Sequence, residues 1–129
     1  MIEVVLILTL FGIVTAAAVP SMVAARTGVE LRSAALGLVG AMVRARRGAL
    51  AEGRSWQVRV RDRRVDLIPA GVSGSSELLA GGAELAGATS GGDVRFFPDG
   101  LAENATFTLE LRGQRRSVIV NQRGRLRVE

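Results

Sequence analysis

The sequence predicts an α+β protein in which one long N-terminal helix, first transmembrane and then amphipathic, packs against a C-terminal antiparallel β-sheet domain. Three observations lead to this fold class. An uncharged run of 22 residues extends from Val4 to Ala25. Apolar residues then recur at helical spacing as far as Gly53, and beyond it they alternate with polar residues as they do in strands. With 129 residues, the chain has room for one globular domain.

The uncharged run is long enough to cross a membrane. As a helix, 22 residues span about 33 Å, and the hydrocarbon core of a bilayer is about 30 Å thick. We therefore expect residues 1–25 to form the transmembrane part of the helix. A cleavable secretory signal is the alternative, but its basic region would precede the apolar core, whereas here the acid Glu3 does.

Residues 26–52 are expected to continue the same helix in amphipathic form, from about Ile2 to Glu52 and over about 75 Å in all. Pro20 removes one backbone donor, which predicts a kink or a local loosening. Gly53 is the expected stop. Packing against the sheet is favoured over coiled-coil pairing, because an alanine-rich seam makes a poor zipper. The apolar stripe consists of Leu31, Ala35, Leu38, Met42, Ala45 and Ala49.

Residues 53–129 are expected to form an antiparallel sheet, because short turn signals separate successive strand-like segments. The turns fall at Asp62-Arg63, Pro98-Asp99-Gly100, Gly113 and Arg123-Gly124. The glycine-rich segment 69–92 is expected to be a long loop, with a short helical or strand piece at Glu77–Leu79. The predicted strands are Trp56–Val60, Val65–Ile68, Asp93–Phe97, Thr106–Leu111, Ser117–Val120 and Arg125–Glu129.

The composition excludes most catalytic chemistry. The sequence contains no His, Cys, Lys or Tyr. It therefore has no imidazole base or ligand, no thiolate, no Schiff-base lysine and no cysteine-type zinc site. Asp62 and Asp66 are the best candidate acid pair, but they adjoin arginines and no base, nucleophile or metal cluster joins them. We expect no enzyme activity, no cofactor and no bound metal.

The first 25 residues, MIEVVLILTLFGIVTAAAVPSMVAA, resemble the N-terminal helix of type IV pilins and type II secretion pseudopilins. Glu3, Gly12 and Pro20 match the acid, the small residue and the helix proline of that family. The resemblance implies that these three residues serve assembly, with Glu3 pairing with the N-terminal amine of a neighbouring subunit. The alternative for Glu3 is a carboxylate at the membrane interface, where the positive end of the helix dipole favours it. The resemblance also implies a basic leader ending in Gly upstream of Met1, which a prepilin peptidase removes.

The C-terminal half resembles the GspH/FimT subgroup of minor pseudopilins and minor pilins, through VRFFPDG at 94–100, a following hairpin and GRLR at 124–127. This implies a structural subunit of a type II secretion pseudopilus or a type IV pilus, whose partners are other pilin or pseudopilin subunits. An unrelated single-pass, membrane-anchored domain is an alternative.

The resemblance also implies a location. The protein would be a single-pass protein of the bacterial inner membrane with its C-terminal domain in the periplasm, later assembled into a periplasmic pseudopilus or a surface pilus. Arg26 and Arg32 after the span would by themselves favour the opposite orientation. The cations of the implied leader would offset them.

The net charge of +5 is the sum of strongly charged segments of opposite sign. Residues 26–64 carry net +7, residues 65–111 net −6 and residues 112–129 net +5, and Glu3 adds one negative charge. Some members of the resembled subgroup bind incoming DNA in natural transformation through a Gly-Arg-x-Arg motif. Arg123, Gly124, Arg125 and Arg127 are therefore candidate DNA-binding residues. A solvated face that pairs with acidic surfaces of neighbouring subunits is the alternative.

Overall fold

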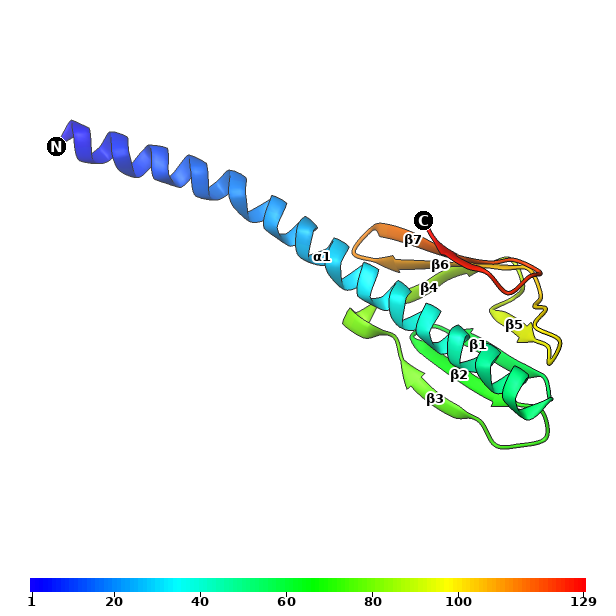
Figure 1. Ribbon diagram of the computed structural model, residues 1–129. Coiled ribbons are helices and arrows are strands. Elements are labelled where there is room, and N and C mark those ends of the chain that lie inside the picture. The colour runs from blue at the N-terminus through cyan, green and yellow to red at the C-terminus, as the bar shows by residue number, and fades with distance from the viewer.

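A single helix, α1 (Ile2–Glu52), dominates the computed structural model, which describes all 129 residues (Figure 1). The helix runs without interruption through Pro20 and is bowed rather than straight. It ends where Gly53 adopts a left-handed conformation with φ of 64° and donates its N–H to the carbonyl oxygen of Ala49, 3.1 Å away. Glycine reaches this conformation without the strain that a Cβ atom brings. The predicted extent and stop of the helix are confirmed.

Eight strands form two four-stranded antiparallel sheets, where the sequence predicted one sheet. The first sheet has the order β3-β2-β1-β5 and the second the order β4-β6-β7-β8. The chain passes back and forth between them, because β3 and β5 belong to one sheet and β4 and β6 to the other. The strands are β1 (Trp56–Arg61), β2 (Arg64–Pro69), β3 (Ser75–Leu78), β4 (Glu84–Ala88), β5 (Asp93–Phe96), β6 (Ala105–Leu111), β7 (Gln114–Val120) and β8 (Leu126–Val128).

The prediction of a long loop over residues 69–92 is wrong, apart from the short helical or strand piece expected at Glu77–Leu79, which overlaps β3. This segment contains β3, the 3₁₀ turn η1 (Ala80–Gly82) and β4. Both strands lie at sheet edges, and all four residues of β3 are exposed. An edge strand is held by backbone hydrogen bonds to one neighbour, so it needs no alternation of apolar and polar side chains. Without that alternation the sequence signal for these two strands is weak.

Both sheets bury their inner faces against the second half of α1. Every residue of the predicted helix stripe is at most 2% exposed. Facing it, Val58 pairs with both Leu67 and Val94, and Phe107 pairs with Val118. These residues are all buried, so helix and sheets share one core. The alanines of the stripe let the sheet side chains approach the helix backbone closely.

The tip of the β6–β7 hairpin holds the helix where its buried half begins. Gln114 donates from Nε2 to the carbonyl oxygen of Ala24 at 3.1 Å. At the tip, Arg112 Nη1 lies 3.4 Å from Thr27 Oγ1 and 3.7 Å from Glu30 Oε2. Thr27 is itself buried. The sheet domain therefore starts directly at the end of the uncharged run, with no linker between them.

Candidate functional site: an exposed apolar helix and an arginine turn

The first half of α1 exposes its apolar side chains in every direction. Leu6, Ile7 and Leu8 follow one another around the helix and are 70%, 59% and 66% exposed. The helix is long and apolar enough to span a membrane, and none of its most apolar 18-residue window is buried. Since an all-round apolar surface is costly in water, this half needs lipid or other helices around it.

The polar groups of this exposed half are already satisfied internally, apart from one. Thr9 Oγ1 donates to the carbonyl oxygen of Val5 at 2.7 Å, and Thr15 Oγ1 to that of Phe11 at 2.8 Å. Ser21 Oγ donates to the carbonyl oxygen of Ala18 at 2.8 Å. Hydroxyls bonded to their own helix can enter an apolar environment at low cost. Glu3 remains the one side chain here that is charged and has no partner.

The three residues predicted to serve assembly all lie on this exposed half. Glu3 is in the first turn of α1 and Pro20 is inside the helix. A Cβ atom added at Gly12 would meet nothing within 4 Å, so no part of this chain explains that glycine. Gly12 and Ala16 lie one turn apart on one face, an arrangement that allows another helix to come close.

The candidate DNA-binding residues lie mainly on a tight turn between β7 and β8. We call Asn121–Arg125 the arginine turn. Asn121 Oδ1 accepts the backbone N–H groups of Arg123 and Arg125 at 3.1 and 2.9 Å. The N–H of Gly124 donates to the Asn121 carbonyl oxygen at 2.9 Å. These bonds fix the backbone, and the side chains of Arg123 and Arg125 are left exposed without an ion pair.

Gly124 is the point where the arginine turn touches the helix. It is buried, with φ of 71°. A Cβ atom there would lie 2.9 Å from Arg46 Nε and 3.1 Å from the carbonyl oxygen of Gly100. Glycine suits this position because it adopts a left-handed conformation without strain and lets the carbonyl oxygen of Gly100 and the side chain of Arg46 lie close to the turn. Arg46 and Arg47 were not among the predicted site residues, since nothing in the sequence joins them to a turn more than seventy residues later.

The other arginines of the basic C-terminal block (residues 112–129) include residues at both ends of the second sheet. Arg127 pairs with Glu129 at 3.0 Å. Arg112 and Arg115 lie at the opposite end of β7, where Arg112 contacts the helix and Arg115 Nε lies 2.8 Å from Glu110 Oε2. The six C-terminal arginines therefore form no single cluster, and Arg123 and Arg125 are the pair left at one end.

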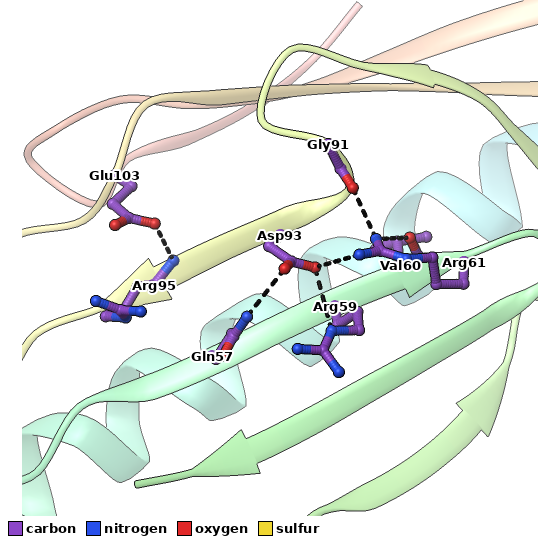
Figure 2. A network of polar contacts seen from close by, with 8 residues as sticks. All are labelled: Gln57, Arg59, Val60, Arg61, Gly91, Asp93, Arg95 and Glu103. Atoms are coloured by element: carbon purple, nitrogen blue, oxygen red, sulfur yellow. Dashed lines mark hydrogen bonds and ion pairs between the residues drawn. The ribbon is translucent and has the colours of Figure 1, made fainter.

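Arginines of the first sheet are used differently (Figure 2). Asp93 Oδ1 lies 3.3 Å from Arg59 Nε and 3.2 Å from Arg61 Nη2, and Gln57 Nε2 donates to Asp93 Oδ2 at 3.1 Å. Arg61 also donates to the carbonyl oxygen of Gly91 at 2.8 Å. These contacts tie β1 to β5 and to the turn before it. Arg59 and Arg61 are thus engaged within the fold.

No group of three or more His, Cys, Asp or Glu side chains gathers anywhere in the chain as a metal site would require. Six of the twelve carboxylates form ion pairs with arginines, as at Asp93 and Glu110. What distinguishes this molecule is an exposed apolar helix and a set of unpaired guanidinium groups at its far end.

Comparisons with known proteins agree with this architecture. The family model described as "Type II transport protein GspH" matches residues 24–124. The minor pilin FimU of Pseudomonas aeruginosa superposes with a TM-score of 0.63 at 19% identity, covering 78% of this chain and 88% of that one. The minor pseudopilin EpsH of the Vibrio cholerae type II secretion system gives 0.62 at 16% identity, covering 78% and 96%. No curated protein sequence matches significantly.

The family match covers most of the chain, and the two solved structures share its arrangement of one long helix against antiparallel sheets. An unrelated membrane-anchored domain is thereby excluded. The chain belongs to the GspH family of type II transport proteins and has the fold of a minor pilin or minor pseudopilin.

Proposed function

We propose that this chain, a structural subunit of the pilus and pseudopilus class, enters its filament through the exposed half of α1. The observation that carries the proposal is the complete exposure of that half, in which no apolar side chain has a partner within the chain. Apolar packing of such helices buries the surface that lipid covers before assembly.

Before assembly, the same half would anchor the chain in the bacterial inner membrane as a single span, with the sheet domain in the periplasm. A prepilin peptidase would process the chain as its substrate. The family is one of structural subunits, and we propose that the chain has no catalytic activity of its own.

Glu3 is proposed to set the register of assembly by pairing with the N-terminal amine of a neighbouring subunit. Its carboxylate is the unpartnered charge on an otherwise apolar surface, and such a charge is costly in an apolar filament core unless a cation meets it. Gly12 would let a neighbouring helix come close, and Pro20 would allow the helix to adjust.

Co-assembly of a Glu3→Ala variant tests this role, measured as the amount of the chain recovered in sheared filaments with the other subunits. We expect co-assembly to be lost while the sheet domain unfolds as in the wild type. Glu84→Ala is the matched control, because Glu84 is an exposed acid of the sheet domain without an ion pair. Normal incorporation of Glu3→Ala would refute the role.

Binding of DNA by the arginine turn is a second candidate function. It is favoured by the exposure of Arg123 and Arg125 without carboxylate partners. Arg127 would join them by exchanging its contact with Glu129 for a phosphate. Such contacts would read the backbone and not the sequence.

Titration of short duplex DNA into the full chain in zwitterionic nanodiscs tests this candidate. Affinity should fall steeply with salt and drop on Arg125→Ala plus Arg127→Ala. The control pair is Arg112→Ala plus Arg115→Ala, at the other end of β7 and engaged with Glu30 and Glu110. Absence of binding at low salt would end this candidate.

A further inference from the structure

We propose that the pocket between the second half of α1 and the arginine turn receives an acidic segment with aliphatic side chains, contributed by a neighbouring subunit. The proposal deepens the assembly function and rests on it. It assigns a second contact to the chain, beside the last turns of α1 and far along the helix from its exposed first half.

The pocket has a volume of about 570 Å³ and two kinds of lining. Arg46 and Arg47 from the helix meet Arg125 from the turn, and no acidic residue lines the space. Val39, Val43 and Leu50 supply an aliphatic wall from the same helix. A ligand that satisfies both linings must carry negative charge and an apolar side chain close together.

The guanidinium groups of this pocket lack the carboxylate partners that Arg44 and Arg54, the arginines on either side of Arg46 and Arg47 in the chain, possess. Arg46, Arg47 and Arg125 form no ion pair, and Arg46 Nε is buried without a hydrogen-bond acceptor. Two residues before Arg46, Arg44 is paired with Glu77. A donor removed from water and left unpaired is destabilising, and a carboxylate in the pocket would accept from it.

The fold also holds these groups in place before any ligand arrives. Gly124 leaves room for Arg46 to lie against the turn, because a Cβ atom at this position would come too close to Arg46 Nε. Asn121 fixes the backbone at Arg125 through its side-chain oxygen. A site arranged in advance loses less conformational entropy when it binds.

The lining favours a protein segment over nucleic acid or lipid. The pocket contains no aromatic side chain on which a base could stack, and a phosphate backbone has nothing to place against the valines and the leucine. Arg46 lies about 30 Å along the helix beyond Arg26, so the headgroups around the uncharged run are out of reach. An extended segment in which Asp or Glu alternates with Leu or Val matches the lining.

Peptide binding to the full chain in phosphatidylcholine nanodiscs tests the proposal, with empty nanodiscs as the blank. The probe is a fluorescein-labelled peptide of sequence Ala-Asp-Leu-Glu-Val-Asp-Ala, followed by anisotropy. We expect saturable binding that Arg46→Gln and Arg125→Gln each weaken by at least about tenfold. Arg32→Gln should bind as the wild type does, because Arg32 is an exposed, unpaired arginine of the same helix outside the pocket.

Two altered peptides measure separately what the arginines and the aliphatic residues of the pocket contribute to binding. Replacement of the acids by their amides should abolish binding, and replacement of Leu and Val by Ser should weaken it severalfold. Equal binding of the serine peptide would mean charge attraction alone and would overturn the proposal. So would equal binding by wild type and Arg46→Gln, or binding of duplex DNA that depends on Arg46 where the peptide does not bind.

Folding and assembly are controlled separately. Urea midpoints from Trp56 fluorescence show whether each variant is folded, and Arg47→Gln and Arg125→Gln alter exposed residues should Arg46→Gln fail to fold. Glu3→Ala should bind the peptide normally. Failure of assembly through the helix and failure of this pocket therefore give different results.

Discussion

The two halves of α1 are both helical, but one half packs against the sheets of its own chain and the other exposes its apolar side chains. All nine buried residues of the helix lie between Thr27 and Ala49, and none lies before Thr27. The packed half meets the sheets with a stripe that contains several alanines, whereas the exposed half carries large apolar side chains all around. Small apolar residues on one face of a helix indicate a partner within the chain. Large apolar residues on every face indicate a partner outside it.

The strongest way to test this contrast is to shorten a stripe residue. Leu38→Ala should lower the free energy of unfolding of the sheet domain by about 2–5 kcal/mol, because Leu38 is fully buried and its loss leaves a cavity. Urea unfolding of the full chain in detergent, followed by Trp56 fluorescence, measures it. Leu36→Ala is the control, since Leu36 is 53% exposed on the same helix. Equal effects at both positions would contradict the stripe.

Substitution of two helix glycines, Gly48 and Gly37, should change the free energy of unfolding by smaller amounts and in opposite directions. A Cβ atom at Gly48 would collide with the indole of Trp56, so Gly48→Ala should destabilise by about 1–3 kcal/mol. A Cβ atom at Gly37 would meet nothing within 4 Å, so Gly37→Ala should stabilise the helix by about 0.5–1 kcal/mol. The same urea experiment compares them, and stabilisation by Gly48→Ala would show that Trp56 does not rest on that glycine.

The ion pair at the boundary between the two halves should contribute less to stability than the contact of Gly48 with Trp56 does. Arg112→Gln removes the ion pair with Glu30 at the hairpin tip, and we expect a loss of about 0.2–1 kcal/mol, because both groups are partly exposed. High salt should shrink the difference between variant and wild type. A loss that salt leaves unchanged would assign the contact to packing instead of charge.

The smallest effect is expected in the exposed half. Phe11→Ala should change the unfolding of the sheet domain by less than about 0.5 kcal/mol, since Phe11 is 70% exposed and contacts nothing in the core. Trp56 fluorescence in urea again measures it. A loss as large as that of Leu38→Ala would mean that the two halves do not act separately.

Local signals made much of this fold predictable from sequence. The helix from Ile2 to Glu52, its stop at Gly53 and the turn at Gly113 follow from patterns within a few residues. The split into two sheets, the strand β4 and the full extent of β3 do not follow from the sequence, because edge pairing leaves little periodicity in side chains. A pattern along the chain says which residues turn inward but not which sheet they join.

The site divides in the same way. Glu3, Gly12 and Pro20 were located because the run around them is unmistakable, although their roles remain predictions. The sequence motif at Gly124 indicates a concentration of positive charge, but it does not indicate that this glycine packs against Arg46. That contact joins the helix to the last hairpin, and such long-range pairs depend on how both sheets fold against the helix.

The contact of the β6–β7 tip with Ala24 and Thr27 connects the helix rigidly to the sheet domain. Any rotation of the helix at this point carries the sheet domain around by the same angle, because no slack chain separates them. Pro20 lies one turn before Ala24 and lacks a backbone N–H, so we expect the helix to twist more easily there than at the hairpin contact. The direction in which the sheet domain faces is thus set by the rotation of α1 about its own axis.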